Sequence, residues 1–470
     1  MVYLLLLLLL PLLFSFIPLF SGRYSKLLSS FLSFIVLLVT SIFYFHINES
    51  FKTLAFYGVD LNIAINYLSY PLVLLVSIVV FAAILYQDPD IEGSYFSYIF
   101  FLEFSLFGVF MSQNLFLFYI FWELVLIPSY FMIGRWGGPR KDYTALKFLI
   151  YTHVGSVLML VSIFILAYNY YTIYGNFNFD YSSIFKAIPS GSIYYVVLAG
   201  FFLAFFIKLP TVPLHTWAPD VYVESPTTSS MIFSGLLSKM GAYGIFAIFM
   251  EFGDPELGWF IVSLGIISLI YASFSALAQR DLKRMVAYAS IGHMGFISIS
   301  IGVYFISHST LALVGGMFMM FAHGLIIPIL FGTVGSVERS TGTRAIRDLG
   351  GLTKMMPNLA FLMTGGFLAS LGLPGLAGFI AEFSVVVGSW ETITYISFLV
   401  VFGLVLSASY HIWALQRTIF GPYNNYLGKI GDMIPREFWP MLILFLLVLI
   451  FGIFPSPIYN LFLQYSGGVY

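Results

Sequence analysis

The chain has 470 residues, of which 60% are hydrophobic and only 9% are charged, and its formal net charge is −1. Soluble domains carry about 25% charged residues, so this composition excludes a water-soluble globular protein and predicts a chain embedded in lipid. No polar segment is long enough to fold as a separate aqueous domain. We therefore expect a single all-α integral membrane domain.

Two kinds of chemistry are excluded by what the sequence lacks. It contains no cysteine, so thiolate-bound iron–sulfur clusters, thiolate zinc sites and disulfides are not possible. No glycine-rich nucleotide-binding motif follows a plausible strand. We expect no cofactor and no metal in this chain and no nucleic-acid partner, and any redox chemistry must take place in other subunits.

The predicted spans begin at the N-terminus. Residues 1–20 are as apolar as a signal peptide but lack a basic start and a small-residue cleavage site, so they are expected to form the first span. Further apolar segments separated by short polar breaks predict about fourteen transmembrane helices. Their centres fall near residues 10, 35, 77, 103, 124, 157, 205, 238, 267, 293, 321, 372, 404 and 450.

Charge between these spans predicts the orientation. Only Lys52 and Lys186 fall on one side of the membrane. The opposite side carries fifteen basic residues: Arg23, Lys26, Arg135, Arg140, Lys141, Arg280, Lys283, Arg284, Arg339, Arg344, Arg347, Lys354, Arg417, Lys429 and Arg436. Basic loops face the cytoplasm, so we expect a multi-pass protein of the cell membrane, inner or plasma, with both termini outside.

Two spans contain helix-breaking prolines. Pro210 and Pro213 interrupt the segment that follows Lys208, and Pro374 interrupts a later segment at residues 371–375. The two breaks lie five spans apart, and an odd number of intervening spans inverts the second unit relative to the first. We expect N-terminal helices at residues 1–93, inverted five-helix repeats at 94–252 and 257–417, and a C-terminal loop and helix at 418–470.

Ionisable side chains in the middle of spans are the candidate functional residues, because burying a charge there costs a few kcal/mol. This group comprises Glu103, Glu123, Lys208, Lys239 and Glu382, with His293 and His323 as histidines at similar depth. For the charged residues, the alternative to a function is a side chain that snorkels to the membrane surface. For each histidine, simple packing in the interior is as plausible as a function.

Other ionisable residues are weaker candidates. Lys147 lies about one turn inside a basic loop, where snorkelling is as plausible as function, and His153 has only the argument of a lone histidine. His215 follows the first break and is able to hydrogen-bond carbonyls freed there. Glu103 has no local motif, so it either supports another site residue or faces another subunit.

A buried Glu and Lys pair suits a proton carrier. At about 4 Å and an effective dielectric near 20, the pair is stabilised by about 4 kcal/mol, so a change in pairing alters how readily the lysine releases its proton. Arginine would hold its proton throughout. No arginine is predicted at this depth, which favours a relay over a static ion pair.

Several strings resemble the antiporter-like subunits of respiratory complex I and occur in the same order. They are FYIFWEL at 118–124, KLP at 208–210, PLHTWAPD at 213–220, ESPT at 224–227, LLSKMGAYG at 236–244, DLKR at 281–284, AYASIGHMGF at 287–296, AHG at 322–324 and LGLPG at 371–375. Together they extend over residues 95–420. The resemblance places Lys283, within DLKR, among the further candidates.

This resemblance implies roles for matching positions. Glu123 is similar to the carboxylate that pairs with the lysine of the broken seventh helix, here Lys208, and Lys239 is similar to the central lysine of the eighth. His293 and His323 match the histidines leading to the distal half-channel. Glu382, within GFIAEF, holds the twelfth-helix position, where glutamate is typical of the M type and lysine of the L, N and antiporter D types.

Two further points bear on the subunit type. The chain ends soon after the fourteenth predicted helix, whereas the L type continues into a long lateral helix. The M-type carboxylate near the end of the third span has no evident counterpart at residues 87–90, QDPD, and Glu103 is the nearest candidate on that side.

The expected function is therefore proton translocation by a non-redox, M-type subunit of a quinone oxidoreductase that oxidises NADH or another donor. Expected partners are other membrane-arm subunits, including sister antiporter-like subunits, with lipid, water and protons. Alternatives are a subunit of a multisubunit sodium/proton antiporter, a subunit of a membrane-bound hydrogenase, and a structural spacer. Glutamate at 382 argues against the antiporter D type.

Overall fold

The computed structural model describes residues 2–53, 59–391 and 393–467. In this part of the chain, eleven helices are long and apolar enough to cross a membrane, beginning with Tyr3–Phe20. Every predicted span centre except residue 372 falls within a helix, and residue 372 lies between two shorter ones. The chain divides into two compact units. Unit 1 comprises residues 1–84, 88–209 and 239–253, and unit 2 comprises residues 85–87, 210–238 and 254–470.

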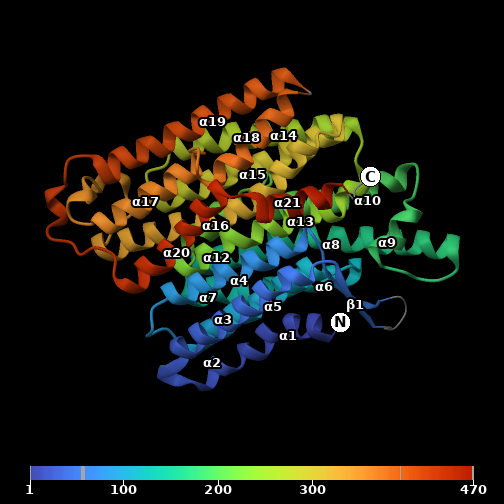
Figure 1. The fold of residues 1–470 in the computed structure, drawn as a ribbon, viewed down its shortest axis with the longest axis horizontal. Helices are drawn as coiled ribbons and strands as arrows, with labels where there is room; N and C mark the ends of the chain where they lie inside the picture. Colours follow the sequence, from blue (N-terminus) through green and yellow to red (C-terminus); the bar gives the residue numbers. More distant parts are fainter. Residues whose placement is uncertain (1, 54–58, 392, 468–470) are drawn as a thin grey trace. The chain divides into compact units, whose positions relative to one another are not determined.

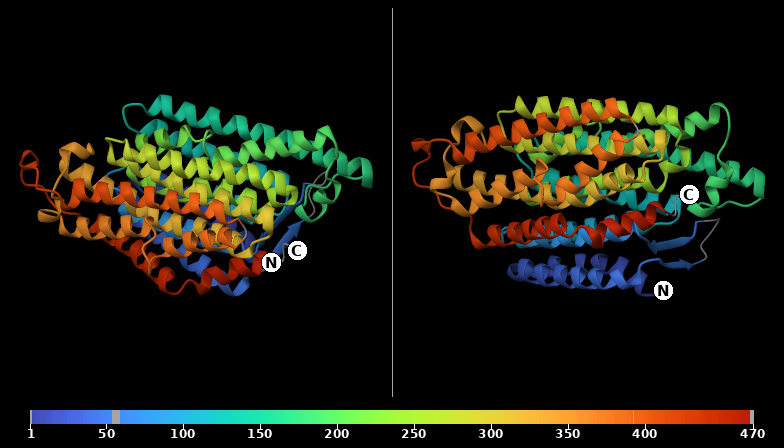
Figure 2. Two further views of the ribbon diagram at one scale, coloured as in Figure 1. Left: turned by 90° about the horizontal axis from the view of Figure 1, so that it is seen from above. Right: turned by 45° about the horizontal axis from the view of Figure 1, so that its top comes forward.

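Unit 1 contains the N-terminal half of the helices (Figure 1). Its elements are α1 (Val2–Ser15), α2 (Ile17–Phe20), η1 (Gly22–Tyr24), α3 (Ser25–Ile42), η2 (Phe43–His46), β1 (Glu49–Thr53), β2 (Leu61–Ile65), α4 (Ser69–Tyr86), α5 (Gly93–Met111), α6 (Leu115–Leu124), α7 (Leu126–Trp136), α8 (Lys141–Tyr174), α9 (Tyr181–Ile184), η4 (Phe185–Ala187), α10 (Ser192–Lys208), α13 (Ser238–Ala247) from its second residue, and η6 (Phe249–Phe252). Figure 2 shows α1 and α3, in dark blue, side by side.

A two-stranded antiparallel hairpin in unit 1 lies outside the candidate spans. Glu49 pairs with Ile65 and Thr53 with Leu61. The Lys52 ammonium bonds the Asp180 carboxylate, and it also contacts Asp60 at 2.9 Å. The hydrogen bonds to Asp180 and then to Asp60 raise the pKa of Lys52. This cluster therefore fastens the hairpin to the segment before α9.

Unit 2 contains the remaining elements. They are α11 (Trp217–Glu224), α12 (Thr227–Ile232), the π-helix η5 (Phe233–Leu237), α14 (Pro255–Leu277), α15 (Leu282–Ser307), α16 (Thr310–Thr341), η7 (Ile346–Asp348), η8 (Leu352–Lys354), α17 (Pro357–Ser370), α18 (Ala377–Trp390), α19 (Thr394–Leu415), the π-helix η9 (Gln416–Phe420), η10 (Asn425–Leu427), α20 (Pro435–Ile453) and α21 (Ser456–Ser466).

The core of unit 2 is formed by α15 and α16, which are buried along almost their whole length. α14 packs along α15, and α18 and α20 pack against α16. Glycines allow the close approach of α14 and α15: a Cβ at Gly265 would stand 2.8 Å from the Gly295 carbonyl oxygen. Polar side chains on α15 and α16 are therefore held away from lipid.

Candidate functional site

The first predicted break is present at the end of α10, which terminates at Lys208. Residue 210 is proline, so the carbonyl of Phe206 has no amide donor four positions along, and Pro213 removes the donor for Leu209 in the same way. The helix therefore stops where Lys208 is fully buried.

The ammonium of Lys208 faces aromatic rings. Its Nζ lies 5.1 Å from the ring centre of Phe148 and 5.8 Å from that of Trp122. Among the described residues it has no hydrogen-bond partner, although the Glu123 carboxylate attracts it through space. The direct partner of Glu123 is His153, whose Nδ1 lies 2.9 Å from Oε2. The structure thus brings together Glu123, Lys208 and His153 in unit 1.

Lys239 is fully buried on α13, directly after the π-helix η5. Such π-helical turns occur frequently at functional sites. Gly241 brings this helix onto the broken end of α10, since a Cβ there would lie 2.6 Å from both the Leu209 amide nitrogen and the Phe205 carbonyl oxygen. Close approach at Gly241 therefore positions Lys239 beside the helix that ends in Lys208.

Gly241→Ala is expected to destabilise the protein by about 1–3 kcal/mol, because the colliding atoms belong to backbone and cannot rotate away. The measurement is the thermal unfolding midpoint of the purified complex. Gly134→Ala on α7 is the matched control, because its Cβ would meet nothing closer than 3.7 Å and alanine favours a helix. Equal midpoints for the two variants would contradict the proposed role of the close approach.

Two weaker candidates in unit 1 are also located. Glu103 is fully buried on α5, and neither carboxylate oxygen has a hydrogen-bond partner among the described residues. Glu103 lies inside the chain and so does not face another subunit. Lys147 is partly exposed on α8, with its Nζ 5.8 Å from the ring centre of Tyr143.

The second predicted break is present between α17 and α18 and holds His293. The carbonyl of Ser370 lacks its helical donor because residue 374 is proline. His293 Nε2 takes this place at 2.7 Å, while its Nδ1 lies 2.8 Å from the Ala289 carbonyl oxygen. Carbonyl oxygens only accept, so an imidazole with a hydrogen on each ring nitrogen would make both contacts as hydrogen bonds. Glu382 Oε1 lies 3.5 Å from Nε2.

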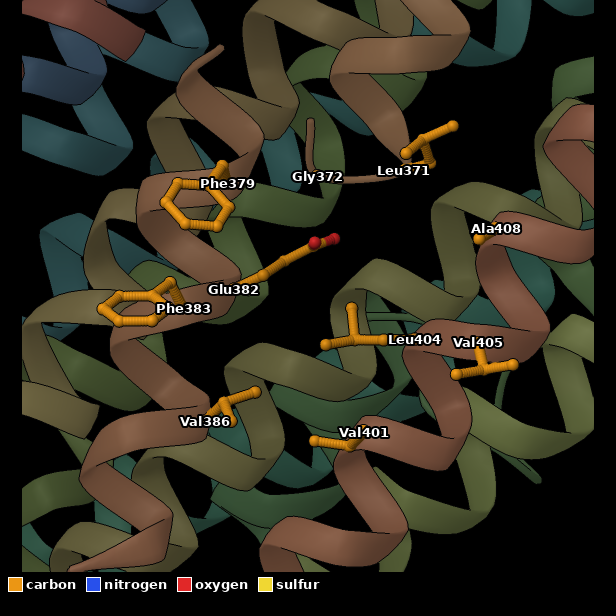
Figure 3. Close-up of a pocket in the computed structure, with 10 residues that line it drawn as sticks. All are labelled: Leu371, Gly372, Phe379, Glu382, Phe383, Val386, Val401, Leu404, Val405 and Ala408. Atoms are coloured by element: carbon orange, nitrogen blue, oxygen red, sulfur yellow. The ribbon is translucent and has the colours of Figure 1, made fainter. Parts of the chain in front are cut away.

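Glu382 reaches from α18 into a cavity of about 300 Å³ (Figure 3). A Cβ at Gly372 would stand 2.0 Å from Glu382 Oε2, so only glycine leaves room for the carboxylate in this position. The remaining lining is apolar: Leu371, Phe379, Phe383 and Val386, with Val401, Leu404, Val405 and Ala408 of α19. Glu382 is thus the acidic group of an otherwise apolar cavity.

His323 on α16 lies beside His293, with ring centres 5.5 Å apart. A cavity of about 10 Å³ is lined by both histidines and by Ser370 and Gly378, which is close to the volume that one water molecule needs. The described residues hold no cluster of three or more side chains placed to bind a metal ion. The arrangement suits hydrogen-bonded proton transfer.

Lys283 lies apart from these residues, at the start of α15. It is buried and donates from Nζ to the Ser225 carbonyl oxygen at 2.7 Å. Neighbouring Arg284 contacts Asp220 at 3.2 Å. These bonds fasten α15 to the end of α11.

Three features were not predicted from the sequence. The helix containing Glu123 is interrupted at Val125, where α6 ends and α7 begins, and Pro128 four residues after Leu124 was the available signal. The contact between His153 and Glu123 depends on helix rotation, which the sequence does not encode locally. The third is His411, buried on α19 with its ring centre 6.4 Å from that of His293.

Comparisons with known proteins identify the family and the fold. The family described as NADH:quinone oxidoreductase/Mrp antiporter, transmembrane, matches residues 112–407. A chain of respiratory complex I from Thermus thermophilus with bound NADH is similar over 99% of this chain and 100% of that chain, with a TM-score of 0.89 and 26% identity. The fold is therefore the antiporter-like fold of the complex I membrane arm.

Sequence relatives indicate the type of subunit. F(420)H(2) dehydrogenase subunit M of Methanosarcina mazei is 38% identical over 433 residues, covering 90% of this chain and 86% of the relative. NADH-quinone oxidoreductase subunit M of Escherichia coli is 34% identical over 415 residues, covering 86% and 81%. The chain belongs to the NADH:quinone oxidoreductase/Mrp antiporter family and is an M-type membrane-arm subunit, a multi-pass membrane protein of a multisubunit complex.

Proposed function

We propose that the chain translocates protons across the membrane as part of a complex I-like quinone oxidoreductase. The observation that carries this proposal is the burial of ionisable side chains beside two proline breaks, Lys208 at one and His293 with Glu382 at the other. Charged groups at such depth are expensive to bury and are retained where they have a function. The names of the relatives suggest NADH or F420H2 as the electron donor of the complex.

The proposed route runs from the cytoplasm to the outside. A proton enters near Lys208, passes to Lys239, crosses by His293, His323 and bound water, and leaves by Glu382. The drive comes from redox chemistry in other subunits and reaches this chain as a change in the attraction between Glu123 and Lys208. His153 supports Glu123 by hydrogen bonding, and Glu103 is a further carboxyl group on the uptake side.

The proposed topology has fourteen transmembrane helices, with inverted repeats at residues 94–252 and 257–417. Within the described part of the chain, eleven helices meet the length and hydropathy requirement directly. The three further spans are proposed at the shorter helical segments near residues 205, 238 and 372. With the basic loops in the cytoplasm, both termini face outward, and sister antiporter-like subunits are the proposed neighbours in the membrane arm.

Glu382→Gln tests this proposal, because the amide keeps the shape of the side chain and cannot carry a proton. Proton translocation per electron by the complex in vesicles is expected to fall at least about tenfold. Glu391→Gln is the matched control, since Glu391 lies exposed at the end of the same helix. Undiminished translocation by the Glu382 variant would favour the structural spacer.

A further inference from the structure

His411 is a buried imidazole for which the proposed route has no use. It lies on the inner face of α19, fully buried, while Val405 and Ile412 on the same helix are exposed. Its Nδ1 lies 2.9 Å from the carbonyl oxygen of Ser407, one turn earlier. Because that carbonyl only accepts, Nδ1 carries a hydrogen, and in the neutral ring the lone pair is on Nε2.

The Nε2 atom of His411 is buried and has no hydrogen-bond partner within the described part of the chain. Since Nδ1 bonds the helix to which His411 belongs, Nε2 points away from α19 and into the interior of unit 2. A buried nitrogen acceptor left without a donor is unfavourable unless it is used. This atom is therefore available to receive a proton.

The groups around His411 come from several helices. α15 contributes His293, and α17 contributes Phe367, whose ring centre is 5.4 Å away. Glu382 is the titratable residue of α18, and Tyr410 on α19 packs at 4.3 Å between ring centres. Tyr271 of α14 packs against His215. His293 is therefore the titratable base among the neighbours of His411.

Charge decides how the two imidazoles share protons. In its cationic form His293 would donate from both ring nitrogens to carbonyl oxygens, with Glu382 as its counter-charge. A second imidazolium at a ring separation of 6.4 Å would be repelled by the first. When the pair carries one proton in excess of the neutral rings, that proton is on either His293 or His411.

We infer that His411 is a second binding site for the proton that His293 carries, so that the relay branches from α15 to α19. In the transfer, the N–H bond at His293 Nε2 breaks and an N–H bond forms at His411 Nε2, through one bridging water. His293 becomes neutral, His411 becomes cationic, and the net charge is unchanged. The inference rests on the proposed proton relay.

His411→Asn tests this branch. The asparagine amide is able to donate to the Ser407 carbonyl as Nδ1 does, but it cannot take up a proton. In the whole complex reconstituted in vesicles, translocation per electron is expected to fall about tenfold, and its dependence on pH is expected to change. His308→Asn is the matched control, because His308 is exposed at φ 54°, a conformation that asparagine tolerates.

The outcomes separate this inference from the proposed function. If His411→Asn shows the wild-type rate and pH profile, the branch is overturned. The proposed relay itself would still stand if Lys239→Ala abolishes translocation. His411→Gln, which places its amide near the Nε2 position, should show the same loss. Failure of both His411 variants to assemble would make His411 a structural residue and would also overturn the inference.

Discussion

Replacing Lys239 with alanine is expected to abolish proton translocation by the complex in vesicles while assembly of the complex persists. Lys239 is the fully buried lysine of α13, next to the π-helix η5. Alanine removes the proton-carrying amine at this point of the route. It also removes the free-energy cost of burying a charge, so the helix itself is not expected to lose stability through electrostatics.

The measurement is acidification of vesicles at a matched rate of quinone reduction, with the amount of assembled complex determined in parallel. Lys186→Ala is the control, since Lys186 is exposed on the short helix η4. Lys239→Arg should also fail, because a guanidinium keeps its proton. Normal acidification by Lys239→Ala with full assembly would refute the relay and support the spacer.

Gly372→Ala is expected to lower translocation by about tenfold to a hundredfold. The new Cβ would stand 2.0 Å from Glu382 Oε2, and this oxygen is the mobile end of a side chain. The carboxylate therefore moves, while the surrounding helices stay in place. Its new position lengthens the 3.5 Å separation from His293 Nε2, and proton transfer is sensitive to displacements of about 1 Å.

Gly375→Ala separates this displacement from backbone strain. Both glycines have positive φ, 77° at Gly372 and 91° at Gly375, but a Cβ at Gly375 would meet no atom within 4 Å. Each alanine costs roughly 1–2 kcal/mol in backbone conformation. Equal translocation by the two variants would show that strain, and not the position of Glu382, determines the rate.

Much of the fold followed from hydrophobicity and proline. Apolar length placed the spans, and the prolines at 210 and 374 located the two breaks. The hairpin at Glu49–Thr53 and Leu61–Ile65 could not be predicted in this way. Its strands are five residues each, and the acid that holds Lys52 lies at position 180, far along the chain.

The candidate site was predictable in its members but less so in its contacts. Burial of Lys208, Lys239 and Glu382 followed from their depth in apolar segments. Which side chains meet depends on helix rotation and on backbone carbonyls, and neither is visible in a hydropathy pattern. His411 was missed for this reason, because a single histidine in an apolar helix looks the same whether it packs against leucine or against another imidazole.

The bond between His293 and the Ser370 carbonyl has a consequence for genetics. The acceptor is the peptide oxygen of Ser370 at the end of α17, and Pro374, four positions later, has no N–H that could compete for it. A scan that replaces ionisable side chains leaves this oxygen untouched, and so does any substitution of Ser370 itself. Pro374 has no titratable group, so such a scan also passes over this residue, although its missing N–H leaves the acceptor to His293.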